Sequence, residues 1–250
     1  MLVSLAKRPT GSQNWKWGFN INYTLSKTFN FSNDDQIPFN GAEDTVNTLF
    51  HVNNLRLEKG YAPTDERHRF VFYGQFNVPW QIKVVPSWIW ASHVPMDCRV
   101  ASLSARLPNI ARNACGEQIP DGAALNSAIT AYNALPPCLN PDKSIHTRGP
   151  CNSTQVTLVD PNLHFGDDYN AVSLRISKTI NLTERQSLEL ISEGFNLANT
   201  ANVRGFVNTN FSGFNNDITK ANFNTPSQTA DKFFGPGGAR AFQFGLVYRF

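Results

Sequence analysis

The chain has 250 residues, of which 41% are hydrophobic and 16% charged, and its net charge at pH 7 is +3. A transmembrane helix needs about 18 consecutive apolar residues. The sequence has no such run, and no signal-peptide pattern follows Met1. The small, scattered positive charge argues against nucleic-acid binding. Nineteen phenylalanines in a chain of low charge indicate a β-rich protein whose hydrophobic residues alternate with polar ones.

The first two predicted strands lie at 1–7 and 14–27, separated by a turn at 8–12 that contains proline and glycine. Residues 1–7 have the pattern of the end of a strand that begins before this sequence. In 14–27 every second residue is large and apolar, which is the period of one face of a β-strand. The length suits a tilted membrane strand, which needs about 9–11 residues. The alternating residues are Trp15, Trp17, Phe19, Ile21, Tyr23 and Leu25.

Residues 28–65 have no periodicity and predict an exposed loop. Strands are predicted next at 67–79 and 82–92, joined by a short turn at 79–81. Pro86 lies inside the second of these strands, and proline within a strand favours an edge position or a bulge. The apolar positions of the pair are Phe70, Phe72, Phe76, Val78, Trp80, Ile82, Val84, Trp88 and Trp90.

All four cysteines fall within the longest irregular stretch, 93–168. An even number in one loop predicts two disulfides and an oxidising compartment, because the spacings match no zinc site. Pairing by nearness gives Cys98–Cys115 and Cys138–Cys151, which is one of three possible connectivities.

The same stretch contains one predicted helix. Asp121 suits its N-cap, and Pro136 and Pro137 end it. Between them, apolar residues follow helical spacing, so we expect a short amphipathic helix packed on a disulfide-bonded loop. They are Leu125, Ala128, Ile129, Tyr132 and Leu135.

Two further strands, 169–182 and 186–197, form a predicted hairpin around a tight turn at 183–185. Lys178 interrupts the apolar side of the first strand, and near a membrane boundary its long stem would extend to the headgroups. A three-residue turn places Arg175 opposite Glu193, an opposite-charge pair that helps to set the register.

Residues 198–238 predict another long loop before a last strand at 240–250. Connections near 8–14, 79–81 and 183–185 are short, whereas 28–65, 93–168 and 198–238 are long. Outer-membrane β-barrels have short periplasmic turns and long extracellular loops. The predicted fold is therefore all-β: an antiparallel up-and-down segment of about seven strands from a larger transmembrane barrel, with one helix and disulfides in its long loops.

The end of the chain resembles the C-terminal strand of bacterial outer-membrane barrels, which the barrel assembly machinery recognises by a terminal Phe after alternating apolar residues. The residues of this signal are Phe242, Phe244, Leu246, Tyr248 and Phe250. Three further segments, in this order, resemble the C-terminal barrel strands of TonB-dependent outer-membrane receptors. The closest likeness is to the Oar-like group, which carries a carboxypeptidase-regulatory-like domain. These segments are Tyr23-Thr24-Leu25-Ser26-Lys27, Asp65-Glu66-Arg67-His68-Arg69-Phe70 and Glu193-Gly194-Phe195-Asn196-Leu197-Ala198-Asn199.

The resemblance implies a Gram-negative outer-membrane location, a barrel of about 22 strands, an N-terminal plug and a TonB box. We therefore expect a C-terminal portion of a transport receptor that is not an enzyme and has no cofactor. Its expected partners are outer-membrane lipid, the barrel assembly machinery, an extracellular substrate of unknown identity and, through the missing N-terminal part alone, the TonB complex. Nucleic acid is not expected.

Six charged residues fall on the polar sides of predicted strands and are candidates for lining the barrel lumen. An alternative is that they form a solvated wall of ion pairs without a ligand. These candidates are Lys16, Arg69, Arg175, Glu189, Glu193 and Arg249.

No catalytic or metal site is predicted. Asp34-Asp35 and Asp167-Asp168 lack EF-hand spacing and suit polar turns better than calcium sites. The five histidines are scattered, no nucleophile elbow occurs, and the glycines at 235–238 precede a strand instead of a phosphate-binding helix.

Two other functions compete with the receptor. In a secreted, disulfide-bonded β-sandwich binding module, the apolar sides of the strands would form a core between two sheets. An outer-membrane enzyme on a small closed barrel would require an even number of strands and a catalytic constellation, and the sequence provides neither.

Overall fold

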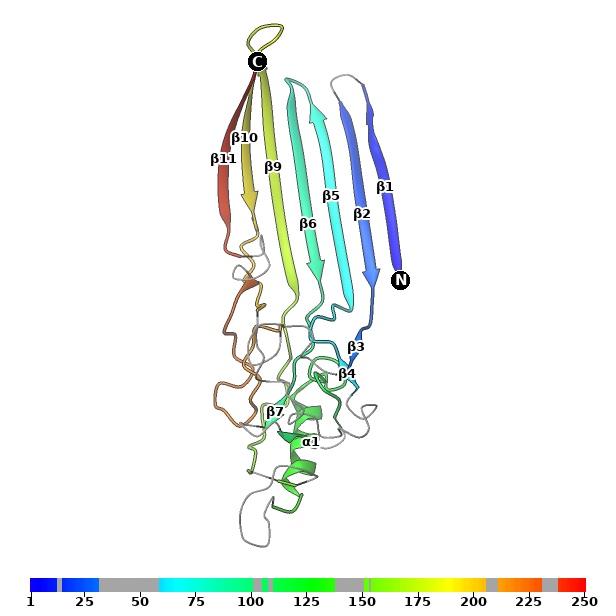
Figure 1. Ribbon diagram of the computed structural model, residues 1–250, viewed down its shortest axis with the longest axis vertical. Helices are drawn as coiled ribbons and strands as arrows, with labels where there is room; N and C mark the ends of the chain where they lie inside the picture. The colour runs from blue at the N-terminus through cyan, green and yellow to red at the C-terminus, as the bar shows by residue number, and fades with distance from the viewer. Residues whose placement is uncertain are drawn as a thin grey trace.

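The computed structural model describes residues 1–12, 15–31, 59–100, 105–107, 110–137, 151–152, 154–205, 211–230 and 238–250. Its main element is one antiparallel sheet of seven strands, in which every strand lies beside its neighbours in chain order (Figure 1). The strands are β1 (Leu2–Gly11), β2 (Lys16–Leu25), β5 (His68–Val78), β6 (Ile82–Ala91), β9 (Tyr169–Asn181), β10 (Ser187–Phe195) and β11 (Ala241–Arg249).

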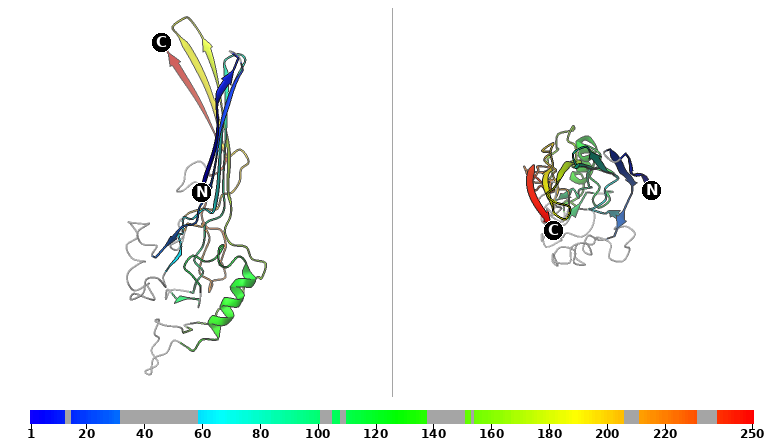
Figure 2. Two further views of the ribbon diagram at one scale, coloured as in Figure 1. Left: turned by 90° about the vertical axis from the view of Figure 1, so that its right-hand side faces the viewer. Right: turned by 90° about the horizontal axis from the view of Figure 1, so that it is seen from above.

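The predicted antiparallel, up-and-down β class is confirmed, and each strand of the sheet overlaps a segment that the sequence predicts as a strand. Seen from above, the strands follow an arc and do not close into a barrel (Figure 2). β1 and β11 lie at the two edges, and each has a single neighbour in this sheet.

The turn predicted at 8–12 is wrong, because β1 continues through Gly11. The register of β1 against β2 shifts between Lys7 and Thr10, which marks an irregularity of the bulge type. Pro9 lies within this shift on an edge strand, and edges and bulges are where strands accept proline.

Pro86 does not mark an edge, because β6 lies between β5 and β9. Pairing with β5 is instead interrupted at the proline, between the pairs Tyr73–Ser87 and Phe76–Val84. Gly74 faces Pro86 across this gap, and a Cβ on Gly74 would lie 3.0 Å from the proline Cγ. The missing N–H and the ring are thus accommodated by a local gap and a glycine, so that the strand passes through the sheet interior.

The register brings most of the large apolar residues of the seven strands onto one side, which we call the apolar face; the opposite side, which also holds Ile89, is the polar face. Phe72, for example, lies between Ile21 and Trp88, since directly opposed residues point to the same side of a sheet. Lys178 interrupts this face as the sequence predicts. The apolar face comprises Val3, Leu5, Trp17, Phe19, Ile21, Tyr23, Phe70, Phe72, Phe76, Val78, Ile82, Val84, Trp88, Trp90, Val172, Leu174, Ile176, Ile180, Leu188, Leu190, Phe242, Phe244, Leu246 and Tyr248.

Short and long connections lie at opposite ends of the sheet (Figure 1). At the short-turn end, Trp80 and Gln81 turn the chain with φ values of 63° and 60°, and positive φ at both central residues is typical of a two-residue hairpin. At the next hairpin, the N–H groups of Leu182 and Thr183 donate to the Gln186 carbonyl, which confirms the predicted tight turn. The C-terminus lies at this same end.

The described parts of 26–31, 59–67, 92–168 and 196–240, which we call the loop body, pack beyond the other end of the sheet. The loop body contains helix α1 (Gly122–Asn133) and two small sheets. In these, β3 (Phe29–Asn30) pairs with β4 (Gly60–Tyr61), and β7 (Arg99–Val100) pairs with β8 (Ala105–Arg106). Its buried core includes Met96, Val100, Leu107, Cys115, Ile119, Leu125, Ile129, Tyr132, Val156, Phe165, Phe214 and Ile218.

Helix α1 is confirmed, including its cap, because Asp121 Oδ1 accepts a hydrogen bond of 2.8 Å from the Ala124 N–H. Leu125, Ile129 and Tyr132 bury one side of the helix in the core. The helix ends before Leu135, which still packs against that core.

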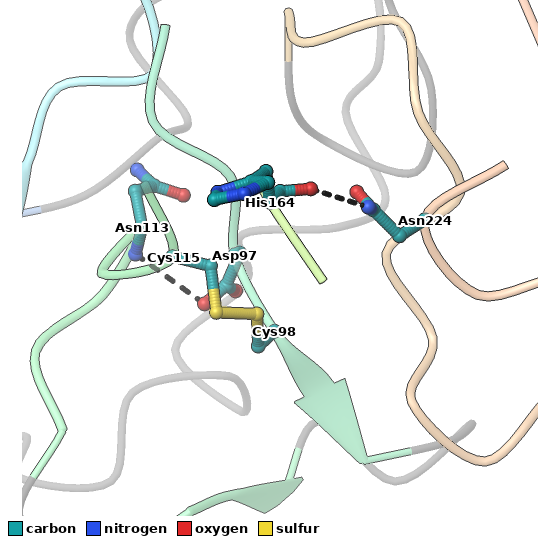
Figure 3. Close-up of a disulfide and its surroundings, with 6 residues drawn as sticks. All are labelled: Asp97, Cys98, Asn113, Cys115, His164 and Asn224. Carbon is teal, nitrogen blue, oxygen red and sulfur yellow. Dashed lines mark hydrogen bonds between the residues drawn. A yellow bond between two sulfur atoms is a disulfide. The ribbon is translucent and has the colours of Figure 1, made fainter. Parts of the chain in front are cut away.

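The predicted Cys98–Cys115 disulfide is confirmed, and it joins segments that are also paired through their backbones. Met96 and Cys115 exchange hydrogen bonds of 2.9 and 3.0 Å. Beside the disulfide, the Asn113 N–H donates to Asp97 Oδ1 (Figure 3). Cys151 is also disulfide-bonded, and Cys138 lies outside the described residues.

Candidate functional site

Two surfaces of the sheet are candidates for function: the apolar face and the polar face. The apolar face is uncovered to an unusual degree. Trp17 is 46% exposed, Trp88 41% and Phe244 77%. Isolated exposed hydrophobic residues are ordinary, but a contiguous apolar surface marks a contact with lipid or another partner. A sandwich would hide these residues between two sheets, and among the described residues no second sheet packs on this face.

Aromatic residues with polar edges mark the ends of the apolar face. Near the loop body, the Tyr23 hydroxyl and His68 Nδ1 lie 2.7 Å apart, and Trp88 Nε1 donates to Asn170 Oδ1. Towards the short turns lie Trp17 and Tyr248, with aliphatic and phenyl side chains between the two ends. Tyr23 is six residues from Trp17 on β2, which at ~3.3 Å per residue separates them by about 20 Å. This spacing resembles the apolar band and aromatic girdles of membrane barrels.

The register places all six predicted lumen residues on the polar face, but they do not form one cluster. Arg175 and Glu193 pair at 3.1 Å, as the predicted turn requires, and Arg249 pairs with Glu189 at 2.6 Å. Arg69 instead binds Glu66 of the loop body, while Lys16 lies opposite Asn77 at the short-turn end. Most of the predicted set therefore forms a wall of ion pairs.

A cavity of about 280 Å³ lies where the polar face meets the loop body. Arg69, Ile89 and Tyr169 enter it from the loop-body ends of β5, β6 and β9, and the remaining lining residues come from the loop body. The full lining is Thr64, Glu66, Arg69, Ile89, Val94, Tyr169, Arg204 and Phe211.

Arg204 is the most constrained charge of this cavity. The residue is 5% exposed, and its Nη2 donates to the Ser92 carbonyl at 2.7 Å. Burial lowers the pKa of its guanidinium, and nearby Glu66, Asp167 and Asp168 oppose that shift. Arginine remains protonated because its ordinary pKa is very high. The cavity wall therefore carries a permanent positive charge.

The two aspartates near Arg204 are engaged elsewhere. Asp167 Oδ2 accepts from the Val203 N–H and Asp168 Oδ1 from the His93 N–H, so both carboxylates link segments that are distant in the chain. Within the described residues, no group of His, Cys, Asp and Glu is arranged to hold a metal. Asp34-Asp35, His51 and His146 lie outside these residues.

The sequence indicates only Arg69 among the charges of this cavity. Arg204 lies in an Asn-rich connection without periodicity, and its neighbours Ser92 and Tyr169 are distant in the chain. In the sequence, Arg204 is preceded by the apolar residue Val203, but this neighbour alone does not predict a binding site.

Comparison with family models, curated proteins and solved structures finds no significant match to this chain. Among the described residues, no helix is long and apolar enough to cross a membrane. The geometry of the sheet and of the cavity is therefore the basis for inferring a function.

Proposed function

We propose that this chain is the C-terminal part of a TonB-dependent receptor barrel in the outer membrane of a Gram-negative bacterium. The observation that carries the proposal is the apolar face, which spans all seven strands and remains uncovered by protein among the described residues. In this arrangement lipid covers the apolar face, and the polar face lines the lumen.

The connections support one orientation. The short turns and the C-terminus lie at one end and the loop body at the other, as periplasmic turns and extracellular loops do in such barrels. The C-terminal assembly signal is then on the periplasmic side, and the loop body contributes to the binding of an extracellular substrate.

The two edge strands imply that further strands complete the barrel. Unpaired N–H and C=O groups cost several kcal/mol each in lipid, so β1 and β11 need partners in the membrane. Energised uptake also needs the plug and the TonB box of the N-terminal part of such a receptor. We therefore expect no uptake by the isolated chain in a receptor-null cell.

The test is whether lipid contacts the apolar face. The chain is refolded in a detergent whose alkyl chains carry bromine, which quenches nearby tryptophan fluorescence, because micelles leave the unpaired edges of β1 and β11 within reach of water. We expect strong quenching that weakens in Trp88→Phe, whereas the same chain in plain buffer should aggregate. A monomeric, folded chain in buffer without detergent would refute the membrane proposal and favour the secreted β-sandwich.

A further inference from the structure

The cavity at the junction of the polar face and the loop body contains an arginine that has no carboxylate partner among the described residues. The Nη2–Ser92 bond is the one hydrogen bond that the Arg204 side chain makes with the described residues, and no carboxylate there lies within 4.0 Å of its nitrogens. Burying a charge without an ion-pair partner is costly. A buried, unpaired guanidinium in a cavity wall is therefore expected where a ligand supplies the missing anion.

Among the described residues, the nearby carboxylates favour the charged form of Arg204 from a distance, and none of them accepts a hydrogen bond from it. Glu66 Oε2 accepts a 2.7 Å hydrogen bond from Arg69 Nη1, so these two lining charges neutralise each other. Asp167 and Asp168 influence Arg204 from a distance but do not line the cavity. The lining itself thus carries one net positive charge, which suits a ligand with one negative charge.

The rest of the lining is largely apolar, with Ile89, Val94 and Phe211 on the cavity wall and the Tyr169 ring beside them. A volume of about 280 Å³ is at the lower limit for small-molecule sites. It accommodates a small ligand or one end group of a larger one. The planar fork of an arginine matches a carboxylate in two parallel hydrogen bonds.

We infer that this cavity binds the carboxylate of a small apolar organic acid, or such a group at the end of a larger substrate, with Arg204 as its anion-binding residue. As a statement about the receptor's substrate class, the inference rests on the proposed function. The binding itself needs only the folded chain. Inorganic phosphate, with its higher charge and no apolar part, should bind poorly.

The experiment compares two probes of the same shape, 3-phenylpropanoate and its neutral amide, by calorimetry on the full chain refolded in detergent, with blank micelles subtracted. We expect the acid to bind and the amide to bind about ten- to a hundredfold more weakly, the range expected for losing a charged hydrogen bond. Arg204→Gln should reduce acid binding by a similar factor. Arg175→Gln, which removes an arginine from the polar face outside the cavity, should leave it unchanged.

Arg204 also donates a hydrogen bond to the Ser92 carbonyl, and Arg204→Gln removes this bond, so the variant can unfold the loop body. Arg204→Lys keeps the charge without the planar fork and should show intermediate binding, and the acid–amide comparison needs no variant. Equal affinity for acid and amide, full acid binding by a folded Arg204→Gln, or no acid binding by the folded wild-type chain would each overturn the inference. Bromine quenching on the same preparation tests the membrane proposal separately, so either can fail alone.

Discussion

The sheet and the loop body place their apolar residues in opposite environments. In the loop body Leu125 and Ile129 are fully buried, whereas in β11 Phe244 is 77% exposed. Both regions are rich in hydrophobic residues, but only the loop body buries them against protein. One part of the chain thus has the interior of a water-soluble domain, and the other has a surface that water alone does not stabilise.

The difference shows what each region needs in order to fold. The loop body carries its own core, a capped helix and a disulfide, all within a few segments of the chain. The sheet carries a regular hydrogen-bond ladder, but its hydrophobic stabilisation depends on what covers the apolar face. The sheet and the loop body should therefore respond differently to the same type of mutation.

The largest expected effect is a cavity in the loop body. Leu125→Ala should lower the free energy of unfolding of this region by about 2–5 kcal/mol, because the surrounding core closes only partly. If lipid covers the apolar face as proposed, Leu246→Ala should cost less, since lipid chains would close over the smaller side chain. Hydrogen exchange at the amides of α1 and β11 measures the loss of stability in each variant. Equal losses would show that the two regions bury their apolar residues in the same way.

Phe244→Lys tests the environment of the apolar face. In a bilayer a lysine near mid-depth costs about 2–4 kcal/mol, whereas a substitution on a water-exposed surface changes stability by only about 0.5 kcal/mol. Gln243→Lys, on the polar face beside it, is the matched control. Urea unfolding of the two variants in detergent micelles compares their stabilities, and equal stabilities would mean that no apolar chain contacts Phe244.

Removing the Cys98–Cys115 disulfide should weaken the loop body alone. The bridge spans a sequence separation of 17 residues, and loops of about this length are stabilised by about 3 kcal/mol. The double variant Cys98→Ser/Cys115→Ser should lose protease resistance in the loop body, while bromine quenching of the sheet tryptophans stays constant. Loss of quenching would show that the sheet depends on the loop body.

The Arg175–Glu193 pair should contribute little to sheet stability. Exposed ion pairs are worth about 0.2–1 kcal/mol, and Arg175 is half exposed. A double-mutant cycle with Arg175→Gln and Glu193→Gln measures the coupling. A coupling well above this range would indicate that the pair on the polar face is shielded from water.

The smallest expected effect is a pH dependence from Asp65. Burial raises the pKa of its carboxyl above the ordinary 3.8, against the hydrogen bond from the Thr28 N–H. The folded state therefore binds this proton more tightly than the unfolded state. The stabilisation that protonated Asp65 contributes is complete below the ordinary pKa of the carboxyl. It is lost as the pH rises through the pKa that this carboxyl has in the folded state. Asp65→Asn should remove that slope, and pH-dependent unfolding curves of the two chains should otherwise run parallel.

The strands of the sheet were predictable because the alternation that marks each strand lies within one short segment of the sequence. A period of two assigns each strand and its apolar side without knowledge of any partner, and turn length then fixed Arg175 opposite Glu193. Where local rules compete, prediction was less successful. Pro9 and Gly11 suggested a turn, but an edge strand with an irregular register accommodates both.

The loop body and the cavity were largely unpredictable, because they depend on contacts between distant segments. Asp121 and the following helix are local signals and were found. Phe165 and Phe214 join the same core from different connections, and no spacing predicts this. Arg204 likewise gains its character from burial beside Ser92, 112 residues away.

The gap at Gly74 and Pro86 has a consequence for related chains. A side chain at Gly74 would meet the Phe76 ring at 2.9 Å and the proline ring at 3.0 Å, so the two aromatic neighbours Phe72 and Phe76 already occupy that space. Glycine is therefore the restricted position, because any residue with a Cβ would press on two phenylalanine rings and the proline ring at once. In descendants of a common ancestor, we expect this glycine to be inherited wherever the three rings are inherited.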